Sequence, residues 1–327
     1  MASLNLNQDQ QALLQNIASL YDSLSTLPSL LPSPQVNSLF TELVTACIPP
    51  SEIDVSKLDM EAQEMRLKLI DLCSNGEGLL ENHYSDILAS YENPLDHLSL
   101  FPYYTNYLKL SQLEFELLSQ HVNGMPMRVA FIGSGPLPLS LLVLATYHMT
   151  TTRFHGYDRE PSATIRARKL LKSDADMASR VEFRTADVMS LTHVLSSYDV
   201  VFLAALVGID KEEKARVVEH LNRYMAVGSV LVVRSAHGAR GFLYPVVGSD
   251  ELKGFEVASI YHPQDEVINS VIVAKKLPSV HAHVHLPGEV APVQGGLPLR
   301  TCCCCEREAI MVSGCKMEEL AREELQS

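Results

Sequence analysis

The sequence lacks an excess of positive charge, a long apolar run and a secretory leader. Its formal net charge is −13, so no basic stripe is available for nucleic-acid phosphates, and a cationic small molecule suits it better. No uncharged apolar run reaches the roughly 18 residues that a membrane-spanning helix needs. The N-terminus lacks the basic and apolar segments of a secretory signal. These absences predict a cytoplasmic protein without an integral membrane segment.

The cysteines do not form a disulfide framework. Cys47 and Cys73 stand far apart, and the other five crowd together at Cys302, Cys303, Cys304, Cys305 and Cys315. This distribution favours a reducing, intracellular location. Adjacent cysteines lack the spacing of a closed zinc site, so no metal ligand is assigned. The histidines of "HAHVH" and the cysteine run leave adventitious metal binding or cysteine acylation open.

Three regions differ in their residue patterns. Residues 1–122 repeat apolar positions at intervals of three and four, as in "QALLQNIASLYDSL", which predicts a helical domain. Residues 123–277 alternate short β-branched runs with helical stretches, which predicts βαβ units and a parallel sheet. Residues 278–327 lose this periodicity and are rich in proline, histidine and cysteine, so we expect a disordered tail.

The middle region predicts an α/β fold with a Rossmann-like sheet. Five parallel strands are expected at 128–133, 153–158, 181–187, 198–206 and 229–235. Helices are expected between them at 137–147, 161–173, 189–196 and 210–224. The last two strands, 255–261 and 269–275, have a link too short for a crossover helix and should pair antiparallel. In the first region, a helix is expected to begin at Ser51.

The stretch "VAFIGSGPLPLS", residues 129–140, leads the first strand into a glycine turn. Gly133, Ser134 and Gly135 are placed to bring backbone N–H groups close to a nucleotide. The dinucleotide fingerprint asks for a third glycine, but Pro138 stands in its place, which disfavours a dehydrogenase. A plain structural turn is the alternative.

Acidic and small residues follow the other strands at the same predicted edge. Asp158, at the end of the second strand, is placed to accept hydrogen bonds from ribose hydroxyls. Ser162 is also expected to bind the cofactor. Asp187 is placed to accept a hydrogen bond from an adenine amino group. Ala204 and Ala205 leave room beside the crevice. Either aspartate could instead be a helix cap. The pattern of strands and sites resembles a class I S-adenosylmethionine-dependent methyltransferase.

Longer motifs resemble plant nicotianamine synthases over about residues 5–277. They are "NPLDHLSLFPYYTNYLKLSQLEFELL", "MRVAFIGSGPLPLSLLVLA" and "GFEVASIYHPQDEVINSVIVAKK", with the stretch from "YDVVFLAALVG" to "GFLYPVV". The resemblance implies a methyltransferase-like domain with a helical N-terminal domain covering its active site. The implied reaction condenses three S-adenosylmethionine molecules by 3-amino-3-carboxypropyl transfer, giving nicotianamine and three methylthioadenosines. It would support metal chelation and iron and zinc homeostasis, with no cofactor beyond the substrate.

The resemblance also implies a catalytic glutamate and tyrosine, which we place at Glu81 and Tyr107. Glu77 lies four residues before Glu81, so the two would share a face of a regular helix. Tyr104, three residues before Tyr107, is a further candidate for a catalytic residue. The incoming amine must lose a proton, and a carboxylate with a raised pKa or a Tyr–Glu pair would take it. Alternatively, the glutamates are solvated and the tyrosines anchor the domain interface.

The loop after the fifth strand, "RSAHGARGFLYP", offers further candidates. Arg234 and Arg240 could clamp substrate carboxylates, and His237 could accept a proton. Each could instead be structural, the arginines as partners of acidic neighbours.

Several alternatives stay open at this point. An ordinary small-molecule methyltransferase would release S-adenosylhomocysteine, and a non-catalytic module would bind S-adenosylmethionine without turnover. A homo-oligomer is open. The stretch "YDSL" at Tyr21–Leu24 fits a tyrosine-based sorting pattern, which leaves vesicle association open beside the cytoplasmic location.

Overall fold

The computed structural model describes residues 7–278, and from residue 279 onward the predicted tail lies outside the described residues. The helical region contains α1 (Gln8–Ser25), α2 (Pro34–Cys47), η1 (Val55–Lys57), α3 (Met60–Ser90), η2 (Pro94–Leu100) and α4 (Tyr104–Ser119). The strands are β1 (Arg128–Ile132), β2 (Arg153–Asp158), β3 (Val181–Thr185), β4 (Val200–Leu203), β5 (Val230–Ser235), β6 (Phe255–Tyr261) and β7 (Ser270–Lys276). Between the strands lie α5 (Leu139–Val143), η3 (Leu144–His148), α6 (Pro161–Leu170), α7 (Ala175–Arg180), η4 (Val188–Ser190), η5 (His193–Ser197), α8 (Lys211–Tyr224), η6 (Gly238–Phe242) and η7 (Ser249–Glu251).

The strands form one seven-stranded sheet in the order β3-β2-β1-β4-β5-β7-β6. The first five are parallel, and β7 runs antiparallel to both β5 and β6. The predicted parallel sheet and its antiparallel C-terminal pair are therefore confirmed. The strand order reverses between β1 and β4, and open α/β sheets bind ligands beside the carboxyl ends of the strands at such a point.

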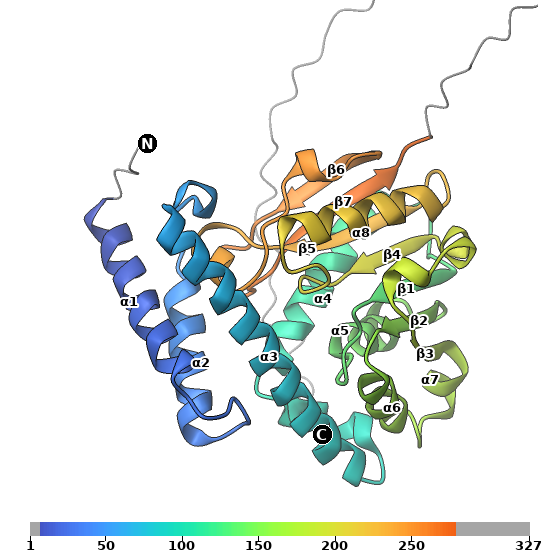
Figure 1. The fold of residues 1–327 in the computed structure, drawn as a ribbon. Helices are drawn as coiled ribbons and strands as arrows, with labels where there is room; N and C mark the ends of the chain where they lie inside the picture. Colours follow the sequence, from blue (N-terminus) through green and yellow to red (C-terminus); the bar gives the residue numbers. More distant parts are fainter. Residues whose placement is uncertain (1–6, 279–327) are drawn as a thin grey trace, which may run out of the picture. The chain divides into compact units, whose positions relative to one another are not determined.

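Alternate residues of the strands feed two separate cores, one on each face of the sheet. On β1, Val129 and Phe131 pack with α4, α5 and α6, whereas Ala130 and Ile132 pack with α8. Figure 1 shows α8 lying across one face of the sheet. The strands are apolar on both faces because helices cover both.

The long helix α3 is tied to the sheet region at two points along its length. Near its start, the Arg66 Nε donates to the Gly241 carbonyl in η6 at 2.6 Å. Near its end, the Arg166 guanidinium of α6 donates two bonds to Asp86, both at 3.0 Å. A core shared by α1, α2, α3 and η6, including Leu69 and Phe242, packs behind it. These contacts fix the face of α3 that is turned toward the glycine turn.

Some predicted helix boundaries were wrong, for local reasons. The helix expected at Ser51 begins at Met60, because Asp59 is the side chain that caps it, accepting from the Ala62 N–H at 2.8 Å. The helix expected over 189–196 is the pair of short turns η4 and η5, where serine hydroxyls bond back to carbonyls three residues earlier. The helix expected over 137–147 is α5 followed by the π-helical η3, and α7 was not foreseen.

Two sequence features that bear on location can be placed. Leu24 of the Tyr21–Leu24 stretch is 1% exposed, inside the core of the first three helices. The leucine of that sorting pattern is therefore not presented at the surface. Within residues 7–278, none of the helices combines the length and the apolar character that a membrane crossing requires.

A buried lysine holds the loop between β4 and α8. Lys214 is 1% exposed, and its Nζ donates to the Ala205 carbonyl at 2.9 Å and to the Val207 carbonyl. Burial lowers the pKa of Lys214 to about 7, and the nearby Glu251 and Glu213 oppose this shift only in part. Since Ala205 and Val207 belong to the same loop, the ammonium group sets its shape.

The lowered pKa predicts a pH-dependent stability. Between about pH 7 and 10.5 the unfolded chain keeps the Lys214 proton that the folded chain has lost, so stability should rise with pH in that window. Urea denaturation at several pH values should show this slope in the wild type and in Lys211→Met, an exposed change on the same helix. Lys214→Met should lack it. An equal slope in all three proteins would contradict the assignment.

Candidate active site

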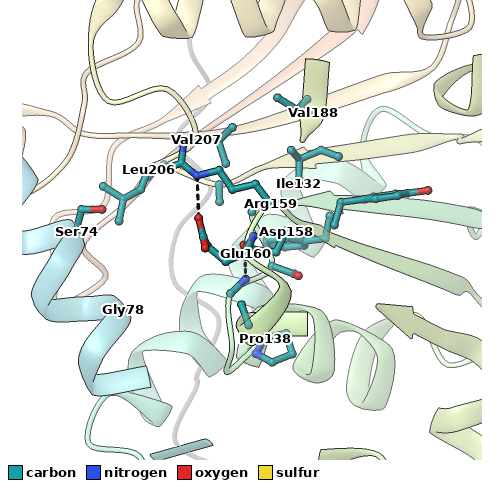
Figure 2. Close-up of a pocket in the computed structure, with 18 of the residues that line it drawn as sticks. Ser74, Gly78, Ile132, Pro138, Asp158, Arg159, Glu160, Val188, Leu206 and Val207 are labelled. Atoms are coloured by element: carbon teal, nitrogen blue, oxygen red, sulfur yellow. Dashed lines mark hydrogen bonds and ion pairs between the residues drawn. The ribbon is translucent and has the colours of Figure 1, made fainter. Parts of the chain in front are cut away.

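A cavity of about 480 Å³ lies where α3 faces the carboxyl ends of β1, β2 and β4. Its walls are the glycine turn after β1, the end of β2, the β4–α8 loop and one face of α3 (Figure 2). Cavities of roughly 300–1,000 Å³ are typical of small-molecule sites. Of the residues predicted to bind cofactor, all reach this cavity: Gly133, Ser134, Gly135, Asp158, Ser162, Asp187, Ala204, Ala205 and Arg234.

The two glycines of the turn make room for parts of the chain as well as for a ligand. Gly133 and Gly135 have φ of 80° and 68°, which favour glycine. A Cβ on Gly133 would lie 2.4 Å from Val207 Cγ2. A Cβ on Gly135 would lie 2.6 Å from Glu81 Oε2. The turn after β1 is therefore where the glutamate of α3 meets the sheet.

Asp158 and Asp187 both line the cavity, and both also cap backbone groups. Asp158 accepts from the Gly135 N–H with one oxygen and from the Glu160 N–H with the other, each at 2.9 Å. Asp187 accepts from the Met189 N–H at 2.8 Å. Part of the role of both aspartates is therefore to cap backbone N–H groups, as the alternative interpretation of the sequence expected. Because Asp158 holds the glycine turn, its removal would disturb the turn as well as any ribose contact.

Two glutamates and two tyrosines form a hydrogen-bonded cluster at the α3 wall. The Tyr107 hydroxyl lies 3.3 Å from Glu77 Oε1 and 3.5 Å from Glu81 Oε1. The Tyr244 hydroxyl donates to Glu77 Oε2 at 2.9 Å. A hydroxyl has one proton to donate, so Tyr107 can serve only one carboxylate at a time. Because Glu77 also accepts from Tyr244, its carboxylate has more hydrogen-bond donors than the carboxylate of Glu81.

The surroundings of the two glutamates shift their pKa values to different extents. Burial raises the pKa of Glu81 well above its ordinary 4.5, the negative charges of Glu77 and Asp158 raise it further, and Tyr107 and Arg234 oppose the shift. Burial also raises the pKa of Glu77, but the hydrogen bonds from Tyr244 and Tyr107 lower it. Glu81 is thus the stronger base of the pair, and its carboxylate borders the cavity.

Arg234 reaches the cavity from β5, but it is already paired. Its Nε and one Nη donate to Glu114 at 2.6 and 2.9 Å, and the same Nη donates to the Ser140 hydroxyl at 2.6 Å. The guanidinium also lies over the Phe131 ring, 5.2 Å from its centroid. The expected clamp on a substrate carboxylate is therefore only partly available, since Glu114 occupies two donors.

Three predicted candidates do not line the cavity. Tyr104 begins α4 and packs against the core beneath the sheet. His237 stacks on His262 with ring centroids 4.1 Å apart. Arg240 donates to backbone carbonyls, including that of Ile48 at 2.9 Å. The structure thus places these three side chains outside the cavity, and a role for them in the site stays a prediction.

The sequence reasoning missed Tyr244 and Asn269, which both line the cavity. Tyr244 stands in the quoted stretch "RSAHGARGFLYP", yet nothing local distinguishes it from a packing aromatic. Asn269 precedes β7, where an isolated asparagine reads as a turn residue. Among the described residues, no group of three or more histidines, cysteines and acids could hold a metal ion.

The fold and the site together define the class of protein. The sheet order, the glycine turn after β1 and the acidic residues at the ends of β2 and β3 are those of the S-adenosylmethionine-dependent methyltransferase fold. A protein-family model described as nicotianamine synthase protein matches residues 6–281. The chain belongs to the nicotianamine synthase family.

Individual relatives agree with this assignment. Nicotianamine synthase 9 of Hordeum vulgare is 55% identical over 331 residues, covering 98% of this chain and 96% of that protein. Nicotianamine synthase of Solanum lycopersicum is 58% identical over 264 residues, covering 81% and 83%. A solved structure of a glutamate-to-glutamine variant of MtNAS in complex with S-adenosylmethionine is 25% identical, with a TM-score of 0.67, covering 81% of this chain and 98% of that one.

The contact between Gly135 and Glu81 predicts a coupled loss of stability. Gly135→Ala and Gly124→Ala both place a side chain at positive φ, at 68° and 85°, which costs roughly 1–2 kcal/mol. A Cβ at Gly124 meets nothing within 4 Å, so it is the matched control. Gly135→Ala should cost roughly 0.5–1.5 kcal/mol more, because the end of the Glu81 side chain must turn away from its place.

Urea denaturation of the single variants and of the Gly135→Ala/Glu81→Ala pair measures this coupling. Removing the Glu81 side chain should abolish the extra loss at Gly135. Equal losses at Gly124 and Gly135, or an extra loss that persists without Glu81, would show that the two residues do not interact.

Proposed function

We propose that this chain condenses three S-adenosylmethionine molecules into nicotianamine by 3-amino-3-carboxypropyl transfer, releasing three methylthioadenosines. Its family membership supports the reaction, and the complex of the MtNAS variant with S-adenosylmethionine supports the substrate. The observation that carries the proposal is the placement of Glu81. A half-buried glutamate whose carboxylate has a raised pKa borders the cavity beside the glycine turn.

The donor molecule is proposed to bind along the sheet edge. The glycine turn would lie against its nucleoside without donating to it, because the Gly133 and Ser134 N–H groups donate to the Tyr157 carbonyl and the Gly135 N–H donates to Asp158. Asp158 and Asp187 would accept from ribose hydroxyls and the adenine amino group. Ser134 and Ser162 add hydroxyls, and the small residues Ala204 and Ala205 leave space for the adenine ring. The aminobutyrate arm would then extend toward α3, because the other walls are occupied by the nucleoside.

The reaction needs an amine aimed at one carbon of the donor. The acceptor nitrogen bonds to the γ-carbon of the donor aminobutyrate while the γ-carbon–sulfur bond breaks. The electron pair of that bond goes to the sulfonium, which leaves as the neutral thioether methylthioadenosine. The acceptor arrives as an ammonium, so a proton must leave it before attack. Positioning of the two molecules decides that the γ-carbon, and not the methyl, is attacked.

Glu81 is proposed to take the proton from the acceptor ammonium. Its raised pKa brings it closer to that of an amine, which makes it a better base than an ordinary glutamate. Tyr107 is proposed to position Glu81, and its own raised pKa keeps the hydroxyl protonated. Glu77, held by Tyr244, is proposed to position Tyr107 and to receive its hydrogen bond when Glu81 takes up the proton.

We further propose that the protein acts in the cytoplasm. The buried Cys47 and Cys73 are both free thiols, which suits a reducing compartment. Imaging of the full chain fused to a fluorescent protein tests this location.

The products identify the reaction. Purified protein with S-adenosylmethionine as the sole substrate should release nicotianamine and methylthioadenosine, measured by mass spectrometry. S-adenosylhomocysteine as the by-product would instead identify a methyltransferase. Tight binding of S-adenosylmethionine without any turnover would indicate a non-catalytic module.

The role of Glu81 predicts a specific kinetic defect. Glu81→Gln keeps the size of the side chain but removes the base, so binding should survive while condensation slows by roughly 10²–10⁴-fold. Single-turnover release of methylthioadenosine over a pH series should rise with pH in the wild type, as Glu81 loses its proton, and should lose this dependence in the variant.

Glu77→Gln and Tyr107→Phe complete the comparison. Each variant should be slower than the wild type, because a side chain that positions Glu81 is lost. Each should retain the pH dependence, because the Glu81 base is still present. A wild-type rate for Glu81→Gln at every pH would refute the assignment and move the search for the base to Glu77.

A further inference from the structure

Gly78 is an unexpected residue for its place in the chain. It lies in the interior of α3, a helix of 31 residues, where glycine is less favourable than alanine because it fixes more backbone freedom. Gly76, on the same helix, has a packing reason: its Cβ would lie 2.4 Å from the Phe40 ring. A Cβ on Gly78 would meet no heavy atom within 4 Å. Packing within the protein therefore does not require glycine at position 78.

The open space beside Gly78 is the cavity itself. Ser74, Gly78 and Asn82 follow one another at intervals of four, so they form one row along α3, next to the row of Glu77 and Glu81. All five line the cavity. Figure 2 shows Ser74 and Gly78 on one wall, with Leu206 and Val207 on the loop opposite. The missing side chain thus widens the cavity three residues before the proposed base, Glu81.

Polar groups without partners line the same cavity. Ser134 and Asn269 are 7% and 8% exposed, and the Ser134 Oγ and Asn269 Nδ2 have no hydrogen-bond partner among the described residues. The Asn82 Oδ1, on the row of Gly78, is likewise buried without a partner. Buried polar groups of this kind are costly unless something pairs with them. A ligand in the cavity would reach these buried atoms only after a side-chain rotation, so the free space beside Gly78 carries the inference.

We propose that Gly78 keeps open the seat of the acceptor, the α-amino acid chain whose amine attacks the donor, and so limits the size of the acceptor. This inference rests on the proposed function. The donor nucleoside fills the glycine turn, and the acceptor amine must still reach Glu81. Beside Glu81, the free space lies next to Gly78, in the row of Ser74, Gly78 and Asn82. Asn82, whose buried amide oxygen lacks a partner, belongs to the same row.

A substitution series at position 78 tests this role. Gly78→Ala and Gly78→Met add side chains that favour the helix and extend into the cavity. Asn75→Met is the matched control, since Asn75 is an exposed residue of α3 outside the cavity. The measurements are thermal denaturation, calorimetric binding of methylthioadenosine, and the rate of turnover against S-adenosylmethionine concentration. Methylthioadenosine carries the nucleoside but no aminobutyrate, so it reports on the donor seat alone.

The expected results separate the two seats. Gly78→Ala should raise the melting temperature by about 1–3 °C, because alanine favours the helix. Methylthioadenosine affinity should stay within about twofold of the wild type in both variants. The S-adenosylmethionine concentration for half-maximal rate should rise about threefold in Gly78→Ala and tenfold or more in Gly78→Met, while Asn75→Met stays unchanged.

Two results would overturn the inference without touching the proposed function. One is a folded Gly78→Met or Gly78→Ala protein with wild-type half-saturation. The other is a parallel loss of methylthioadenosine affinity, which would place Gly78 in the donor seat. A wild-type protein that binds methylthioadenosine but releases none from S-adenosylmethionine would refute the proposed function, and this inference with it.

Discussion

The contact between Glu81 and the glycine turn at Gly135 is the constraint on which the site depends. It places a carboxylate from α3 against the edge of the sheet where a nucleotide-binding turn begins. The contact persists because α3 is anchored on both sides of it, by Arg66 on the η6 carbonyl and by Asp86 on Arg166. If α3 could slide, Glu81 would leave the glycine turn, so the docking of α3 supports the role proposed for Glu81.

A buried arginine opposes part of the negative charge at the cavity walls. Glu77, Glu81 and Asp158 bring negative charge to the same walls, and Arg234 lowers the pKa of both glutamates from within β5. Glu114, at 0% exposure, holds that arginine in place. A buried ion pair adds little net stability after desolvation. Its value here is a fixed positive charge that keeps clustered acids tolerable while Glu81 stays basic.

The sequence allowed most of the sheet to be predicted and only part of the site. The strand Val230–Ser235, predicted at 229–235, followed from an apolar run that is buried on both faces. Glu81 and Tyr107 came from the family resemblance, and helical spacing brought Glu77 to their side. The pairing of Glu114 with Arg234 joins residues 120 apart, and such a contact leaves no local pattern. His237 lies outside the cavity, stacked on His262, because a loop at the right edge can still turn a side chain away.

The protonation state of Glu81 tests this account most directly. Carbon-13 NMR of glutamate-labelled protein, titrated with pH, can follow the carboxyl signals, and the signal missing from Glu81→Gln identifies Glu81. We predict that this signal titrates well above the ordinary glutamate pKa of 4.5, and that it moves to still higher pH in Tyr107→Phe, since the lost hydrogen bond favoured the charged form. A Glu81 signal that titrates at the ordinary value in the wild type would contradict the account.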